Sequence, residues 1–193
     1  MQTHVLTTLL FLGVVTATGA LFSDAATDAE RVQIPVLGLD AESAPAIERA
    51  LRALESEVGP PHVKVLAEVA VDAQRGWLAL EIAPGGTLRL EQVERCLNAT
   101  FARVQRDKLA LGEARLLFEG AAPDDAPEKL QRALTGDLFA QAQVRFEGEP
   151  RRLVADVRPG EMPATLDAAE RAAQRVAPGL KLADAIWSRP RAR

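Results

Sequence analysis

The stretch GLDAESAPAIERAL, residues 38–51, decides the fold that the sequence predicts, because it joins a strand end, a turn and a helix start. From Val32 to Val36, before Gly38, apolar residues alternate with others, which is typical of a half-buried strand. Asp40 or Ser43 can cap the helix that follows. One face of this helix carries five apolar residues, namely Ile47, Ala50, Leu51, Leu54 and Val58.

The next segment predicts a hairpin, a second helix and a last strand. After the breaker Gly59-Pro60-Pro61, apolar residues alternate from Val63 to Val71, and a second β-rich run covers residues 77–82. Residues 90–98 have the apolar spacing of a helix, and residues 101–109 predict a weaker strand. Pro35 cannot donate to a ladder and therefore indicates that the first strand lies at an edge or starts irregularly.

The order strand, helix, strand, strand, helix, strand then repeats from Leu111. Its predicted elements are a strand to Phe118, a helix at 127–134, strands at 143–147 and 153–157, a helix at 163–177 and a strand at 180–187. We interpret this pattern as an internal duplication with its boundary near residue 110. The sequence thus predicts an α+β chain with repeats over 32–110 and 111–188, followed by a basic tail, residues 189–193, that we expect to fray.

Composition and the N-terminus limit the class of protein. An apolar fraction of 48% in 193 residues supports a real core, and a formal charge of −4 excludes a general nucleic-acid binder. The run from Val5 to Phe22 has no charge, which fits a cleaved signal peptide, an uncleaved membrane anchor or a buried helix. We expect residues 1–22 to be the signal or anchor and 23–31 a linker, so that the chain is periplasmic, secreted or anchored outside the cytoplasm by residues 5–22.

The repeats resemble the heavy-metal-associated domain of copper chaperones, metal-transporting ATPases and mercury-binding proteins. That family's first loop reads Gly-Met-x-Cys-x-x-Cys and leads into Val-Glu-x-Ala-Leu; here Gly38-Leu39 matches its start and residues 47–51, Ile-Glu-Arg-Ala-Leu, match its helix. The second repeat keeps the spacing from Gly120 to the helix at 130–134. The resemblance implies two tandem ferredoxin-like βαββαβ sandwiches, each an antiparallel sheet with two helices on one face.

Both repeats lack the cysteines that this family uses to hold soft metals. The cysteine positions fall on alanine, aspartate or serine near Gly38, and on Pro123 and Ala126 in the second loop. Cys96 is the only cysteine and His62 the only histidine beyond the leader, so one chain cannot build an ordinary thiolate or imidazole site. We therefore expect two degenerate copies without a motif-based metal site.

The remaining candidate site residues have plainer interpretations. Asp124 and Asp125 could attract a hard cation. We expect instead that they stabilise the positive N-terminal end of the helix that follows, and we expect the same of the acidic residues near Asp40. Cys96 is expected to be a small core residue rather than a metal ligand. Six aromatic residues are scattered along both repeats and are expected to fill the core: Trp77, Phe101, Phe118, Phe139, Phe146 and Trp187.

The sequence therefore favours an exported, non-enzymatic binding protein without a cofactor. No Ser or Cys nucleophile has a base beside it, and the sheet faces and edges are the expected contact surfaces for a protein partner in the cell envelope. Contact with a membrane is expected only through an uncleaved N-terminal segment. Two alternatives stay open: a heavy-metal binder or metal-transport accessory protein that uses acidic loops or a partner's thiol, and a regulatory module that binds a small molecule between the repeats.

Overall fold

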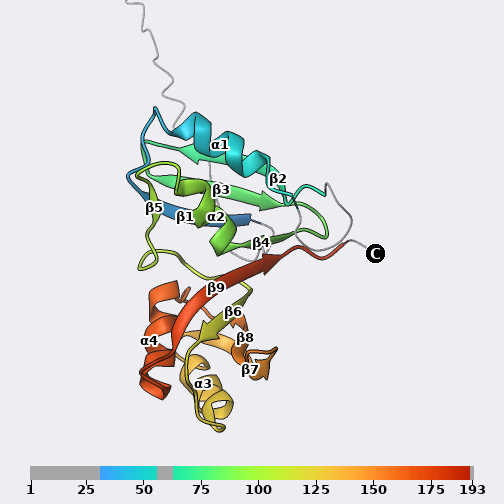
Figure 1. The fold of residues 1–193 in the computed structure, drawn as a ribbon, viewed down its shortest axis with the longest axis vertical. Helices are drawn as coiled ribbons and strands as arrows, with labels where there is room; N and C mark the ends of the chain where they lie inside the picture. Colours follow the sequence, from blue (N-terminus) through green and yellow to red (C-terminus); the bar gives the residue numbers. More distant parts are fainter. Residues whose placement is uncertain (1–30, 56–62, 192–193) are drawn as a thin grey trace, which may run out of the picture.

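The computed structural model describes residues 31–55 and 63–191 of an α+β protein. The described residues form two antiparallel sheets and four helices, which confirms the predicted α+β class (Figure 1). The predicted leader, all but the last residue of the linker, and His62 lie outside the described residues. Within the described ranges, no helix is long and apolar enough to cross a membrane.

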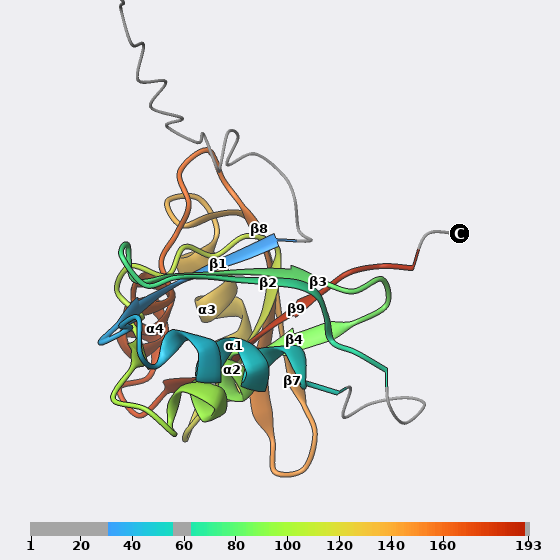
Figure 2. The same ribbon diagram turned by 90° about the horizontal axis from the view of Figure 1, so that it is seen from above.

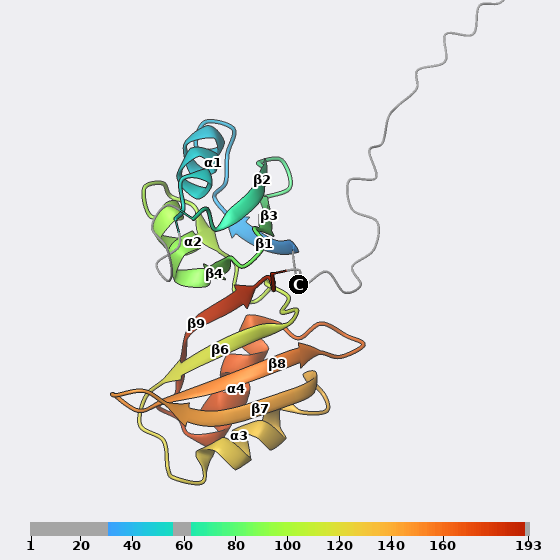
Figure 3. The same ribbon diagram turned by 90° about the vertical axis from the view of Figure 1, so that its right-hand side faces the viewer.

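The first half, residues 31–110, holds a four-stranded sheet with the order β2-β3-β1-β5. Its helices α1 and α2 lie on the same side of this sheet (Figure 3). The elements are β1 (Arg31–Leu37), α1 (Ala44–Arg52), β2 (Leu66–Asp72), β3 (Trp77–Ile82), β4 (Thr87–Arg89), α2 (Leu90–Leu97) and β5 (Arg103–Val104).

The second half, residues 111–188, supplies four strands of a five-stranded sheet with the order β4-β9-β6-β8-β7. Apart from β4, the order is the same as in the first half: last, first, third and second strand of the repeat. The elements are β6 (Ala114–Glu119), α3 (Ala126–Leu134), β7 (Phe139–Glu147), β8 (Arg152–Pro159), α4 (Leu166–Val176) and β9 (Lys181–Ser188).

The core lies between each sheet and its helices because alternate strand residues point to opposite faces. In β1, Val32, Ile34 and Val36 are buried, and α1 buries Ile47 and Leu51. The second half repeats this arrangement with Ala114, Leu116 and Phe118 in β6 and with Leu130 and Leu134 in α3. The face of α1 that the sequence predicts to be apolar therefore contains its buried residues, and α3 buries a corresponding face.

Strand β4 joins the two halves and was not predicted. Although it belongs to the first half, it pairs antiparallel with β9, the last strand of the second half, as Figure 1 shows. Leu88 lies opposite Trp187 in this ladder, and both side chains are buried. The connecting segment is also bound to the second half, since the Leu111 N–H donates to the Ala164 carbonyl over 2.8 Å. The edge of β9 is thus covered by the other half.

Several predicted boundaries were wrong for local reasons. Helix α1 ends at Arg52, because the Leu54 N–H turns back to the Leu51 carbonyl and Glu55 forms a bridge with Lys64. The predicted strand at 101–109 is only Arg103–Val104, since residues 105–109 close a turn of their own.

Two further expectations are corrected by hydrogen bonds. Pro35 is not on an edge strand, since β1 lies between β3 and β5. Its carbonyl accepts from the Gln105 N–H over 2.8 Å, so its ring nitrogen faces the side where β5 is only two residues long. In the basic tail, Arg189 is held: its N–H donates to the Gly86 carbonyl and its guanidinium contacts Glu81 over 3.3 Å. Arg31, placed in the linker, is the first residue of β1.

Candidate functional site

The loop after Gly38 is closed by its own hydrogen bonds. The Asp40 carboxylate accepts the Ser43 N–H over 2.7 Å, and this bond holds the pKa of Asp40 below its usual value. Ser43 is the N-cap residue of α1, but its side chain makes no capping bond to the helix. Asp40 therefore stabilises the turn that precedes the helix.

The predicted metal candidates are not brought together. Asp124 pairs with Arg151 over 2.7 Å, and Asp125 at the N-cap of α3 pairs with Lys129 over 2.7 Å instead of capping the helix with its side chain. Cys96 lies in α2 of the other half, where burial raises the pKa of its thiol. Among residues 31–55 and 63–191, no three His, Cys, Asp or Glu side chains are placed to hold a metal ion.

Exposed apolar side chains concentrate at the loop end of the first sheet. We call Leu37, Trp77 and Phe101 the apolar patch; their exposed fractions are 48%, 37% and 103%. In the described chain, Met162 is the one other large apolar side chain that is exposed. Gly38 brings the patch together, because a Cβ there would lie 2.9 Å from the Phe101 carbonyl oxygen, so the backbones of the two loops touch.

The prediction that all six aromatic residues fill the core was wrong for two of them. Phe118, Phe139 and Trp187 are buried, and Phe146 is half-buried under the Arg151 guanidinium, 3.4 Å from the ring centroid. Trp77 and Phe101 are exposed as described above. The strand alternation already placed Leu37 on the face opposite to the core, but only the register between strands shows that Trp77 is its neighbour.

The patch continues onto the face of the first sheet that no helix covers, which we call the open face. Trp77 pairs with Pro35 in the β1–β3 ladder and with Asp72 in the β2–β3 ladder, so these side chains share one face. One rung further, the pairs between Gln33, Ala79 and Ala70 place small or polar groups on the same face. At its loop end the open face therefore combines the exposed Trp77 with Asp72, which is paired with Arg75, while Pro35 is buried.

The corresponding face of the second sheet is covered by ion pairs. Asp156 in β8 accepts from Arg115 Nε over 2.7 Å and from Arg145 Nη1 over 2.5 Å, and Arg145 also binds Glu147. Burial alone would raise the pKa of Asp156, but the hydrogen bonds and charges of the two arginines outweigh it and hold the pKa below its usual value. This face satisfies its own charges.

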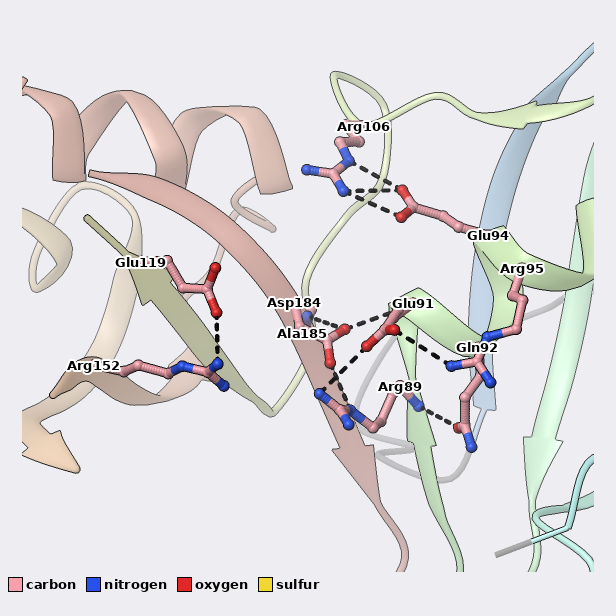
Figure 4. Close-up of polar contacts among 10 residues, drawn as sticks. All are labelled: Arg89, Glu91, Gln92, Glu94, Arg95, Arg106, Glu119, Arg152, Asp184 and Ala185. Atoms are coloured by element: carbon pink, nitrogen blue, oxygen red, sulfur yellow. Dashed lines mark hydrogen bonds and ion pairs between the residues drawn. The ribbon is translucent and has the colours of Figure 1, made fainter. Parts of the chain in front are cut away.

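A second polar cluster ties the two halves together (Figure 4). Asp184 in β9 is only 3% exposed, and its carboxylate accepts from Arg89 Nε over 2.7 Å and from the Glu91 N–H over 3.1 Å. Beside it, Arg106 binds Glu94 over 3.0 Å and reaches the Leu182 carbonyl over 3.3 Å. In the sequence, the sign of this cluster is weak: an aspartate within the apolar run of the last strand.

The structure also has a shallow, open depression on the second half. It is lined by α4 and the segment before β7, through Leu138, Ala168, Arg171, Gln174 and Arg175. Arg171 is paired with Asp167 over 2.5 Å.

Comparison of the sequence with protein-family models and with curated proteins gave no match.

Proposed function

We propose that the protein is a non-enzymatic binding protein that acts through protein–protein contact at the open face of its first sheet. We further propose that it consists of two ferredoxin-like domains, 32–110 and 111–188. The strand order in each half, with the last strand beside the first and the second strand at the far edge, supports this assignment. The additional pairing of β4 with β9 makes the two domains one structural unit.

The difference between the two open faces carries the functional proposal. Both halves have the same strand order, so each has a sheet face without helices. In the second half, the residue before the first loop is Glu119, which is paired with Arg152 over 3.0 Å (Figure 4). In the first half that position is Leu37, beside Trp77 and Phe101. Because the fold tolerates charges at this place, the apolar patch is not a requirement of folding, and such patches typically mark contact surfaces.

Export and descent from heavy-metal-associated domains belong to the same proposal. The loop spacing and helix pattern of both repeats support the descent, while the replacement of every family cysteine supports a function other than metal transfer. The uncharged run from Val5 to Phe22 supports a location outside the cytoplasm.

A photo-crosslinking amino acid placed on each open face tests the proposal in cells that make the protein. Ala70 on β2 and Gln143 on β7 are both exposed edge-strand residues and form a matched pair. We expect a discrete protein adduct from position 70 and none from position 143, and we expect Trp77→Ser to weaken the adduct. Equal yields at both positions would contradict a function for the first face.

A further inference from the structure

We infer that Gln131 of helix α3 closes the outer edge of the second sheet and so prevents a second copy of the chain from adding its own β7 strand there. The inference goes beyond the proposed function, which concerns a face of the first sheet. Three observations support it: the position and composition of β7, the hydrogen bond of Gln131 to the backbone of β7, and a similar bond at the equivalent place in the first half.

Strand β7 has the features of an edge to which other strands add. In the described part of the chain it has a strand neighbour on one side only, since it ends the order β4-β9-β6-β8-β7. It is nine residues long, contains no proline, and its two charged residues, Arg145 and Glu147, have opposite signs. Edge strands of this kind present rows of backbone groups that act as templates for another strand.

Gln131 occupies one of the outward backbone groups of this edge. The Val144 N–H points away from β8 and donates to the Oε1 of Gln131, over 3.3 Å. Helix α3, which carries Gln131, packs beside β7. Backbone groups alternate in direction along a strand, so those of Ala142 and Phe146 point outward as well. The occupied group therefore lies between the two other outward positions.

The start of the same edge is closed by the segment that follows α3. The Phe139 carbonyl accepts the Gly136 N–H over 2.9 Å, and Thr135 forms a bridge with Phe139. A strand added by another chain needs consecutive ladder bonds. With the Val144 N–H also occupied, β7 offers no uninterrupted row of outward groups.

The first half closes its outer strand in a similar way. Val69 in β2 is equivalent to Val144 in β7, because each lies three residues before the last residue of its strand. The Arg52 guanidinium, at the end of α1, donates to the Val69 carbonyl over 2.9 Å, and Glu48 pairs with the same guanidinium over 2.7 Å. Two different side chains thus bind an outward backbone group at the same place, which supports a common role for the first helix of each half.

A second copy of β7 is the strand that an open edge would accept. Two β7 strands related by a two-fold axis at Val144 pair antiparallel, and each Val144 N–H then donates to the Val144 carbonyl of the second copy. Each charged residue of one strand faces a glutamine of the other, so no like charges meet in this ladder. The facing pairs are Arg145 with Gln143 and Glu147 with Gln141. The N–H at the centre of this ladder is the one that Gln131 already binds.

Sedimentation velocity of the purified full chain at about 100 μM, a concentration at which unpaired strand edges associate, tests the inference. We expect Gln131→Met, which removes the acceptor but keeps an unbranched side chain, to form more dimer than the wild type. One open edge per chain gives a closed pair rather than a fibre. Gln131→Ala is a second variant without the acceptor, in a residue that favours a helix.

Two control variants should associate no more than the wild type. Gln131→Glu retains an oxygen that accepts the Val144 N–H. Arg132→Met adds the same apolar side chain at the neighbouring exposed position of α3, where the arginine contacts the Glu128 carbonyl rather than β7. Circular dichroism melting of each variant shows whether the fold is intact.

Hydrogen exchange of single amides, followed by NMR, locates the contact. In dilute, monomeric protein the Val144 amide should exchange about fivefold faster in Gln131→Met than in the wild type, as expected for the loss of one ordinary hydrogen bond. In Gln131→Glu it should stay protected. In the dimer of Gln131→Met, the outward amides of Ala142, Val144 and Phe146 should all be protected.

Three results would overturn the inference. The first is that folded Gln131→Met and Gln131→Ala associate no more than the wild type. The second is that Gln131→Glu or Arg132→Met associates as much as Gln131→Met. The third is a dimer whose outward β7 amides stay unprotected, because the contact would then lie elsewhere. Crosslinking at position 70 depends on a different sheet, so the proposed function stands or falls separately.

Discussion

Asp184, in the last strand of the chain, accepts the Nε–H of Arg89 over 2.7 Å and so binds the residue that immediately precedes helix α2 of the other half. The same carboxylate accepts the Glu91 N–H, which is one of the donors at the helix start that have no partner within the helix. The negative charge of this carboxylate also interacts favourably with the positive N-terminal end of the helix dipole. Helix α2 is thus capped by a side chain that comes from 93 positions further along the chain.

Replacing Asp184 should destabilise the whole protein. We expect Asp184→Ala to lower the free energy of unfolding by about 3 kcal/mol, because it removes the acceptor of a helix N–H and one carboxylate partner of the partly buried Arg89 guanidinium. Asp184→Asn should cost less, since its amide oxygen can still accept one bond. Urea unfolding followed by circular dichroism measures both values. As a control, Asp124→Ala removes an ion pair in which the aspartate side chain is 92% exposed, and we expect a loss below about 0.5 kcal/mol. Similar values for Asp184→Ala and Asp124→Ala would contradict the capping role.

Substitution of Gly120 should be far more costly than substitution of Gly112. Gly120 has a φ of 132°, and a Cβ there would overlap the Gly179 carbonyl oxygen, whereas a Cβ at Gly112 meets nothing within 4 Å. We expect Gly120→Ala to lower the unfolding free energy by about 2 kcal/mol or more. Gly112→Ala should be neutral or raise it by up to about 1 kcal/mol through the unfolded state. Thermal unfolding of the two variants provides the comparison, and an equal response would show that the two loops are not in close contact.

The stabilisation from Asp156 should depend on pH. Its pKa in the folded protein lies below the usual value, so the carboxylate contributes fully above the unfolded pKa of about 3.9 and loses its contribution as the pH falls through the folded pKa. We expect Asp156→Asn to cost about 1 kcal/mol near neutral pH, a modest value because the side chain is 37% exposed and screened by solvent. Urea unfolding at pH 6, 4 and 3 measures the difference in unfolding free energy between wild type and variant. We expect this difference to shrink at pH 3, which is below the unfolded pKa of about 3.9. A constant difference would mean that the two arginines do not set this pKa.

Cys96 should react slowly while the protein is folded. Burial raises the pKa of its thiol and outweighs the opposite effect of Arg95, so the reactive thiolate is scarce at neutral pH. We expect alkylation by iodoacetamide to be slower in the folded chain than in urea and to accelerate as the pH is raised. A Gln143→Cys thiol in a Cys96→Ser chain is the exposed control. Equal rates for the two folded thiols would contradict the burial of Cys96.

The elements that sequence patterns predicted well are those with a strong apolar period. The strand at 77–82 and the α3 helix have clear alternation or helical spacing, and the structure places them within a residue of the prediction. Periodicity also identified the inward face of α1. These local signals are read within one element and need no knowledge of the partner.

Features that depend on distant partners could not be predicted. Strand β4 has only three residues and forms because β9 provides a ladder for it, which no local pattern reveals. The acidic loop residues near Asp124 were interpreted from helix rules alone, whereas their actual partners are Arg151 and Lys129. The apolar patch likewise needed the pairing of β1 with β3 and the contact of Gly38 with the next loop. Register and long-range contact, rather than propensity, determine these places.

The pairing of β4 with β9 also orders events during synthesis. Thr87 and Ser188 face each other across the ladder but are 101 positions apart, so β4 is made about 5 to 20 s before its partner at ordinary elongation rates. During that time the first half lacks both a strand neighbour for β4 and the Asp184 carboxylate at the start of α2. The last strand to be translated supplies both. A product truncated before β9 would therefore be defective in its earliest-made half as well as its last, and would offer quality-control proteases an unpaired strand at both places.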